Sequence, residues 1–501
     1  MGKANIQSKL DQSMPPSIYV FTMDCLRKSI TGASTTPFIS SLPVQWSNCY
    51  SSSTWTLPSH ASLFSGVNAM EHGVTRPRDT LSEEESVLPR EAQNQGYQTA
   101  IFSENPYFSS RKGFDRNIDA VDDGIGWKLL YSTFNPAIHV EGVSTEALSS
   151  LVSEIVQRPG RFENTVNSLY AAYSKFGPQS SSYPHHGQRV LNHLSTFVDE
   201  SEGPILAVTN VLDPHDPYLN TPPSVQESRD RDELRAVEHA HERYNIDKQY
   251  LLTDDGMPEQ IESVFDTWSE LYDSQAEIYR EYSCESDRLL KAWRDRNESV
   301  FDDSLVVIVG DHGQLFGEEG MVGHQTSLHP DGINVPLAIS PPKTWESQAV
   351  ERDGPVSISG VGASLKEVCK GDITSTRELI NRIEEASRDH GDDVTVCVDG
   401  PKWYMKTLYK NEEFHRSLID ALAVRKVAHI GRDRVEIFES PWDSETIDSK
   451  VYEYAEGSRT VLEDENASLD EETKQWLSRG HNEESNGDLS VSSQLKALGY
   501  A

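Results

Sequence analysis

The sequence of 501 residues has no long apolar run, few basic residues and few cysteines. No stretch approaches the ~18 consecutive apolar residues that a membrane-spanning helix needs, so we expect no membrane span. The segment Met1–Pro16 lacks the apolar core of a secretory signal, which predicts a cytoplasmic protein. The five cysteines are widely spaced and form no CxxC pair, which disfavours a disulfide framework and a structural zinc site.

Basic residues number 45 against 80 acidic residues, for a formal net charge of −35 at pH 7. Such a chain repels the phosphate backbone and shows no local basic groove, so we predict no nucleic-acid partner. The acidic residues are dispersed along the chain instead of being collected in one tail. Dispersed acidity is typical of a surface adapted to high salt, where the repulsion is screened, and we predict a halophilic protein.

Short apolar runs alternate with helical segments through the first two thirds of the chain. The runs are rich in β-forming residues and continuous, which indicates burial on both faces, as in a mostly parallel sheet. The clearest helix is predicted over about Ser263–Arg296. We therefore predict an α/β fold with a mostly parallel sheet sandwiched by helices. The predicted strands are Ser17–Met23, Gln98–Phe102, Ile205–Leu212, Ser304–Val309 and Pro336–Ser340.

From about residue 390 the pattern changes to amphipathic β segments, which predict a small antiparallel sheet. An acidic, loosely ordered tail is expected from Glu439. The chain is therefore expected to divide into a core, residues 1–390, and a C-terminal β subdomain with the tail, residues 391–501. Two variable insertions are predicted within the core, at about 107–188 and 221–257. The strands predicted for the small sheet are Val394–Val398, Trp403–Tyr409, Arg425–Ile430 and Arg434–Phe438.

Polar residues follow four of the predicted strands at the point where each strand ends. The carboxyl ends of parallel strands meet at one edge of a sheet, where open α/β sheets bind their ligands. Each residue alone equally suits a helix cap. Together, two carboxylates at neighbouring strand ends repel unless a cation lies between them, and an adjacent imidazole adds a nitrogen ligand. The residues at this predicted edge are Asp24, Asn105, the segment Asp213–Asp216, and the pair Asp311 and His312.

The segment of residues 53–62 combines small hydroxyl residues with Pro58 at the start of a predicted helix. A hydroxyl at a helix N-terminus meets unpaired N–H groups and the positive end of the dipole, which favours an anionic substrate. Ser59 equally suits an ordinary helix cap, and composition alone does not choose the nucleophile among the hydroxyls. His215, which prolines hold on both sides, and His324, in a Gly-rich turn, are candidate functional residues.

Several short motifs occur in colinear order over about Ser17–Ser340. They include TWTLPSHASLFSG at 54–66, EHGV at 71–74, DPHDPY at 213–218 and GDHGQLFGEEG at 310–320. Taken together, these motifs resemble the sulfatase-like branch of the alkaline phosphatase superfamily.

This resemblance implies an alkaline-phosphatase-like core with a small C-terminal β subdomain. It implies that Asp24, Asp311 and His312 bind a metal ion, and that Thr56 is both the nucleophile and the remaining ligand. By the same resemblance, His215 and His324 hold the transferred group or protonate the leaving oxygen.

Several positions depart from the family pattern. Sulfatases carry Cys or Ser, converted to formylglycine, where this chain has Thr56, and Arg where it has His60, which we keep as a candidate catalytic residue. Ser103–Pro106 stands in place of a Gly-Lys-Trp-His run, so a sulfate-binding Lys and a His are missing. Cys25 stands in place of a second carboxylate. A formylglycine sulfatase is therefore disfavoured.

We predict a metal-dependent hydrolase of phosphoric or sulfuric esters that acts through a covalent Thr56 intermediate. Phosphodiesters or phosphonate esters are favoured, as small-molecule, glycan-derived or lipid-derived anionic substrates. One divalent cation is expected; the oxygen and imidazole ligands favour Mn²⁺, and Mg²⁺, Ca²⁺ or Zn²⁺ would also fit.

Four alternatives remain open. The chain could be a sulfuric ester hydrolase without formylglycine, a phospho-group transferase, or a non-catalytic relative that binds an anion. A zinc site at His239 and His241 is the weakest alternative, because their spacing does not place both side chains on one face of a helix.

Overall fold

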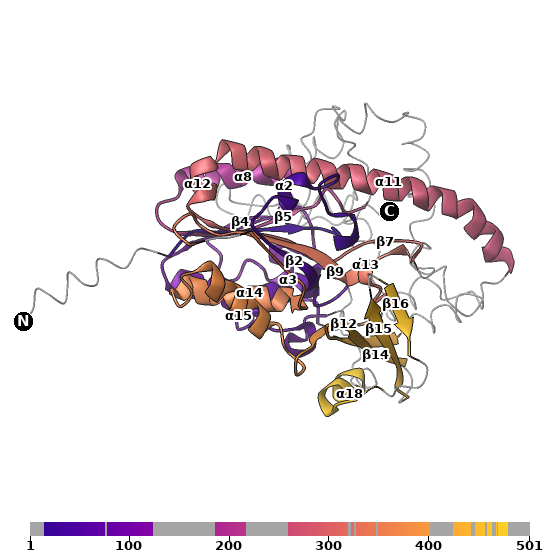
Figure 1. Cartoon of the computed structure of the whole chain (residues 1–501). Coiled ribbons are helices and arrows are strands. Elements are labelled where there is room, and N and C mark those ends of the chain that lie inside the picture. Colours follow the sequence, from indigo (N-terminus) through magenta and orange to yellow (C-terminus); the bar gives the residue numbers. More distant parts are fainter. Residues whose placement is uncertain are drawn as a thin grey trace, which may run out of the picture.

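The computed structural model describes residues 15–75, 78–123, 186–216, 259–318, 322–324, 327–346, 349–400, 424–441, 446–455, 458–462, 467 and 469–478. The predicted insertion at 221–257, with His239 and His241, lies outside these residues, as do most of the insertion at 107–188 and the predicted strand Trp403–Tyr409. The described residues form a central sheet between two layers of helices, with a smaller sheet at one end (Figure 1).

The central sheet has nine strands in the described part of the chain, in the order β10-β2-β9-β6-β1-β5-β3-β4, with β11 also paired to β2. All neighbours run parallel except β9, which is antiparallel to both β2 and β6. The predicted mostly parallel sheet is confirmed. The strands are β1 (Ile18–Met23), β2 (Val44–Tyr50), β3 (Gln98–Phe102), β4 (Ala120–Asp122), β5 (Ile205–Val211), β6 (Leu305–Gly310), β9 (Asn334–Ser340), β10 (Val350–Arg352) and β11 (Val356–Ser357).

The three central strands β5, β1 and β6 end side by side. Met23, the last residue of β1, lies opposite Val211 of β5 and Gly310 of β6. All three strands are fully buried, because helices cover both faces of the sheet. The residues that follow these strands therefore meet at one edge, as the sequence predicts.

Two hydrophobic cores lie on opposite faces of the sheet, since alternate residues of each strand point to opposite sides. Ile18 and Val20 of β1 belong to one core, whereas Tyr19 and Phe21 belong to the other. The first core includes α3 (Thr56–Ser65), α5 (Val87–Asn94), α14 (Ile358–Lys370) and α15 (Thr376–Ala386). The second includes α2 (Pro37–Ser40), α8 (His186–Glu200), α11 (Glu259–Arg296) and α12 (Glu298–Asp302). None of the helices in these described ranges combines the length and apolarity that crossing a bilayer requires.

Shorter elements connect these layers. They are the single 3₁₀ turns η1 (Lys28–Ile30) and η2 (Ser110–Lys112), the helical turns α4 (Ala69–His72) and α13 (Pro330–Ile333), and a two-stranded ribbon of β7 (Leu315–Phe316) and β8 (Val322–Gly323).

The smaller sheet is antiparallel, with five strands among the described residues in the order β12-β13-β14-β15-β16. It packs against the core: Cys397 N–H of β12 donates to the Ser52 carbonyl, 3.1 Å away, and Met70 of α4 joins a cluster with Trp476. The small sheet therefore contacts the loop that leads into α3. Its elements are β12 (Val394–Val398), β13 (Val424–Ile430), β14 (Arg434–Pro441), β15 (Asp448–Ala455), β16 (Ser458–Val461) and the helix α18 (Glu471–Ser478). The division of the chain near residue 390 stays a prediction.

The expectation of a loosely ordered tail from Glu439 is wrong for the described residues, because β14 continues to Pro441 and β15, β16 and α18 follow. The segment after Glu439 is rich in acidic residues, and its apolar residues are sparse. Val451, Trp476 and Leu477 are all buried among otherwise charged neighbours. Val451 belongs to β15, whereas Trp476 and Leu477 of α18 join a cluster with Val427 and Phe438 of the small sheet.

Helix α3, which begins at Thr56, lies directly against α14 at Gly362. A Cβ atom at Gly362 would lie 2.0 Å from the Leu63 carbonyl oxygen of α3. Gly362→Ala is expected to lower the free energy of unfolding by about 3 kcal/mol, since the two helices must move apart. In the matched control Gly354→Ala, the nearest atom is 3.9 Å away, and the change should stay within about 0.5 kcal/mol. Urea denaturation of both variants measures the difference; equal midpoints would contradict it.

Candidate metal-dependent active site

Asp24 and Asp311 occupy the first positions after β1 and β6. The Asp24 N–H donates to the Val211 carbonyl at 3.0 Å, and the Asp311 N–H donates to the Met23 carbonyl at 3.4 Å. These bonds continue the parallel ladder by one residue. Both carboxylates are fully buried at the strand-end edge of the sheet, as predicted.

Each carboxylate has one oxygen in hydrogen bonds and one without a hydrogen-bond partner. Asp311 Oδ1 accepts the backbone N–H groups of Cys25 and His312, at 3.1 and 2.9 Å. Asp24 Oδ2 accepts amide N–H groups from Asn105 and Asn210, at 2.7 and 3.1 Å. Asp24 Oδ1 and Asp311 Oδ2 are buried and have no hydrogen-bond partner in the described residues.

The imidazole of His312 faces both of these oxygens. Its Nδ1–H donates to the Gly313 carbonyl at 2.9 Å, which leaves Nε2 with a lone pair. Nε2 lies 3.5 Å from Asp311 Oδ2 and 3.7 Å from Asp24 Oδ1. Burial lowers the pKa of His312 to about 4, so the ring is neutral at pH 7.

These three side chains fit a divalent cation. Ligand atoms of Asp24, Asp311 and His312 all lie within 4.8 Å of one another. Burial and the neighbouring Asp24 carboxylate raise the pKa of Asp311 well above its usual value, which shows that an ionised pair at this position needs a compensating charge. Two carboxylate oxygens and a neutral imidazole nitrogen are ligands that Mn²⁺, Mg²⁺ and Zn²⁺ accept.

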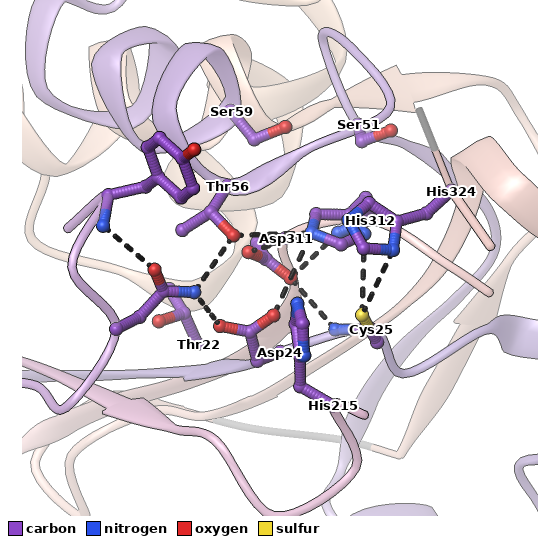
Figure 2. Close-up of polar contacts among 12 residues, drawn as sticks. Thr22, Asp24, Cys25, Ser51, Thr56, Ser59, His215, Asp311, His312 and His324 are labelled. Atoms are coloured by element: carbon purple, nitrogen blue, oxygen red, sulfur yellow. Dashed lines mark hydrogen bonds and ion pairs between the residues drawn. The ribbon is translucent and has the colours of Figure 1, made fainter. Parts of the chain in front are cut away.

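Thr56, the first residue of α3, presents its hydroxyl to the same point (Figure 2). Thr56 Oγ1 lies 3.3 Å from His312 Nε2 and accepts a hydrogen bond of 3.0 Å from Asn105 Nδ2. Asn105 is itself oriented by the Tyr107 N–H, which donates to its Oδ1 at 2.9 Å. The Asn105 amide therefore holds the Thr56 hydroxyl and the Asp24 carboxylate together.

His60 lies one helical turn after Thr56, and both of its ring nitrogens contact protein groups. Nδ1–H donates to the Thr56 carbonyl and Nε2 accepts from the Thr22 hydroxyl, each at 2.9 Å. The ring stacks on Phe108 with centroids 4.1 Å apart, and burial lowers its pKa to about 4. His60 Nδ1 is 3.7 Å from Asp311 Oδ2, so the ring lines the inner wall of the candidate site.

His215 and His324 approach from two other segments. Their ring centroids are 5.2 Å apart, and the His324 ring stacks on His312 at 4.5 Å. His324 Nδ1–H donates to Gln314 Oε1 at 2.9 Å, and His215 Nδ1–H donates to the Asp216 carbonyl. Figure 2 shows the His215 ring directed toward the carboxylates. The structure therefore brings these two histidines to the candidate metal site.

Cys25, which directly follows Asp24, is in the left-handed region with φ of 62°. A residue with a Cβ adopts this conformation at a cost of roughly 1 kcal/mol. The conformation directs the Cys25 N–H to Asp311, and it places the thiol 3.7 Å from His312 Nδ1 and 3.9 Å from His324 Nδ1. The thiol is fully buried.

Two amide side chains at the site received no role from the sequence. The sequence marks Asn105 only as a strand-end residue, and Asn210 lies inside the apolar run of a predicted strand. A buried amide within the run ILAVTNVL has to find a hydrogen-bond partner, and this requirement was the available signal. Both amides hold Asp24 in place.

The chain belongs to the sulfatase family, whose model matches residues 27–365, more than half of the sequence. Sulfatase-family enzymes use a divalent metal ion, and family membership supports hydrolysis of sulfate or phosphonate esters. No curated protein matches the chain.

Solved structures share the fold of this chain at low sequence identity. The phosphonate monoester hydrolase of Agrobacterium radiobacter is 16% identical, with a TM-score of 0.56 over 87% of this chain and 89% of that one. The phosphonate monoester hydrolase SpPMH from Silicibacter pomeroyi is 13% identical, with a TM-score of 0.53 over 89% and 90%. The 2-O GAG sulfatase BT1596 is also 13% identical, with a TM-score of 0.53 over 88% and 85%. These similarities show that the chain shares the fold of these three enzymes.

Proposed function

We propose that this protein is a metal-dependent hydrolase of phosphodiesters or phosphonate esters that uses Thr56 as a covalent nucleophile. One observation carries the proposal: the Thr56 hydroxyl lies 3.3 Å from His312 Nε2, beside two buried carboxylate oxygens that have no hydrogen-bond partner in the described residues. The position of the Thr56 hydroxyl beside these groups is not needed to stabilise the fold. It is where an activated nucleophile belongs.

Asp24, Asp311, His312 and Thr56 would hold the cation, with Mn²⁺ favoured by the mixed oxygen and nitrogen donors. The ion, when bound, would neutralise charge on the ester and lower the pKa of the Thr56 hydroxyl. Asn105 and Asn210 orient Asp24, and the two backbone N–H groups on Asp311 Oδ1 orient the second carboxylate. The ligands are therefore fixed in advance of binding.

In the proposed first step, Thr56 Oγ1 attacks phosphorus and the bond from phosphorus to the leaving oxygen breaks. The Thr56 hydroxyl proton passes to solvent water, and His215 or His324 gives a proton to the leaving oxygen. Thr56 lies in the first turn of α3, where the helix dipole favours the anionic group being transferred. In the second step, water attacks phosphorus and gives a proton to the histidine that protonated the leaving oxygen. The bond from phosphorus to Thr56 Oγ1 breaks, Oγ1 takes up a proton from solvent, and the acid product leaves.

His60 has a positioning role in this scheme. Its neutral ring connects the Thr56 carbonyl to the Thr22 hydroxyl, which fixes the first turn of α3 against the end of β1. Neither nitrogen is directed at a substrate, because both already contact protein groups.

Hydrolysis of sulfuric esters is the second candidate, because the matching family model is that of sulfatases. Thr56 stands where sulfatases carry the residue converted to formylglycine, and Glu104 stands where they carry a Lys. Glu104 forms an ion pair with Arg189 of α8 and contacts the imidazole of His186, which is neutral at pH 7 because burial lowers its pKa to about 4. These two replacements favour a phosphorus ester over a sulfate ester.

The test compares initial rates on bis-(p-nitrophenyl) phosphate, p-nitrophenyl phenylphosphonate and p-nitrophenyl sulfate, in high salt. The metal-free protein receives Mn²⁺, Mg²⁺, Ca²⁺ or Zn²⁺ in turn. We expect metal-dependent release of nitrophenol from the two phosphorus esters, with the sulfate slower. Faster turnover of the sulfate would favour the second candidate, and no metal-dependent turnover of any ester would refute both.

Asn105→Ala is expected to lower kcat by about 10²- to 10³-fold, the usual effect of removing one donor that orients a reacting group. The amide contacts both Thr56 and Asp24, whereas its loss opens only a small space. Asn117→Ala is the control, since Asn117 lies in the turn before β4 and its side-chain amide donates to the Ser86 carbonyl. Steady-state kinetics with saturating Mn²⁺ measure both variants. Equal kcat values for the two variants would remove Asn105 from the mechanism.

A further inference from the structure

The small sheet contains a second group of metal-type ligands, remote in sequence from the proposed active site. His390 lies in the turn before β12, His429 lies on β13, and Asp470 precedes α18. The first and last of these residues, His390 and Asp470, are 80 positions apart in the sequence. Their ligand atoms all lie within 4.8 Å of one another.

The separations suit a single ion. Asp470 Oδ2 lies 3.7 Å from His390 Nδ1 and 3.6 Å from His429 Nε2. Two nitrogen or oxygen ligands of one tetrahedral zinc ion, each at about 2.0–2.1 Å from the metal, are separated by roughly 3.4 Å. The observed distances exceed this value by only a few tenths of an ångström.

Two threonines, Thr395 and Thr473, lie within hydrogen-bond distance of the candidate ligands His429 and Asp470. Thr395 Oγ1 lies 3.2 Å from His429 Nδ1, so its hydroxyl can accept the proton on that nitrogen and leave Nε2 for a metal. The Thr473 hydroxyl donates its one proton to Asp470 Oδ2 at 2.6 Å and therefore accepts from His429 Nε2–H at 2.9 Å. An ion that binds both ligand atoms replaces these two hydrogen bonds, and the His429 proton moves to Nδ1. Asp470 Oδ1 accepts the N–H groups at the start of α18, which leaves Oδ2 facing the imidazoles.

Burial separates this cluster from an ordinary surface ion pair. His429 is 1% exposed, and burial lowers its pKa to about 4, so the ring is a neutral donor at pH 7. His390 is partly exposed, so an ion can reach the cluster from solvent on this side. A neutral buried imidazole, a second imidazole and one carboxylate form a site for a borderline metal such as Zn²⁺ or Co²⁺.

We propose that His390, His429 and Asp470 bind one divalent transition-metal ion that fastens α18 and the turn before β12 to β13. The rings of His390 and His429 stack, with centroids 3.9 Å apart and planes 19° apart. An ion lies in the plane of the ring that binds it, so His390 turns out of the stack on binding while buried His429 stays in place. This site holds a structural ion and takes no part in hydrolysis.

The test uses the full chain with Asp311→Asn, which removes a ligand of the proposed active-site metal, and Co²⁺ as the probe. We expect one Co²⁺ per chain with the intense visible absorption of a tetrahedral site, and a raised melting temperature. Adding His390→Ala should weaken Co²⁺ binding at least tenfold and abolish the rise. His193→Ala is the matched control, because this partly exposed histidine pairs with one carboxylate only, Asp122.

Equal Co²⁺ affinity with and without His390→Ala would overturn the proposal, as would binding without tetrahedral bands. Because His390 is partly exposed, its replacement should leave the fold intact, and circular dichroism checks this. His429→Gln is the second variant and should reproduce the loss of binding. In the otherwise unchanged protein, His390→Ala should leave the rate of ester hydrolysis within twofold, so a failure of the proposed function does not bear on this test.

Discussion

Thr56→Ala is expected to abolish ester hydrolysis, with kcat reduced about 10⁴-fold or more, the range seen when a covalent nucleophile is removed. The variant keeps all three remaining metal ligands and should therefore still bind the cation. Asn105 retains its bond to Asp24 after the hydroxyl is lost, so the free energy of unfolding should change by about 1 kcal/mol or less. Stopped-flow assays with bis-(p-nitrophenyl) phosphate measure the loss.

Thr56→Ser is the control for this result, because it keeps a hydroxyl at the same position and removes only a methyl group. It should retain measurable turnover and should accumulate a phosphoserine, detectable by mass spectrometry after acid quenching. Turnover by Thr56→Ala at the wild-type rate would mean that another group is the nucleophile.

Asp311→Asn is expected to have opposite effects on metal binding and on stability. It removes a carboxylate oxygen from the proposed metal site, so metal content and turnover should both fall at least 100-fold. It also removes one of two buried, mutually repelling carboxylates. The amide Nδ2 would then face His312 Nε2, which carries a lone pair 3.5 Å from the present Oδ2 position. The metal-free variant should therefore be more stable than the metal-free wild type, by about 2 kcal/mol at pH 8.

The stability difference should depend on pH in a defined direction. The pKa of Asp311 is raised in the folded chain, so between the unfolded value of about 4 and the raised value the folded state binds more protons. The free energy of unfolding of the metal-free wild type therefore falls as pH rises through this range, and Asp311→Asn lacks this loss. Urea denaturation in EDTA at pH 5 and pH 8 tests the sign. A variant that is less stable than wild type at both pH values would contradict it.

The sequence predicted the positions of the central strands to within two residues because those strands are buried on both faces. Continuous apolar runs such as ILAVTNVL are rare outside a covered sheet, and polar residues end them abruptly. The strand-end argument then placed Asp24 and Asp311 at one edge without knowledge of any contact. By contrast, strand β2, with the sequence VQWSNCY, escaped notice since polar residues interrupt it.

The hydrogen-bond geometry of the candidate site could not be read from the sequence. Which oxygen of Asp24 is held and which faces the metal site depends on Asn105 and Asn210, which are distant in the chain. Likewise, the sequence does not show that His60 forms a hydrogen bond with the hydroxyl of Thr22, which lies on β1. Such pairings arise from the register between strands, which local patterns do not encode.

The hydrogen bond from Cys397 to Ser52 connects the small sheet to the loop that leads to Thr56, the proposed nucleophile four residues further on. Truncating the chain near residue 390 to obtain a smaller enzyme would therefore remove a contact that supports the loop before α3. Substitutions in the small sheet could likewise change activity without changing any residue of the candidate site.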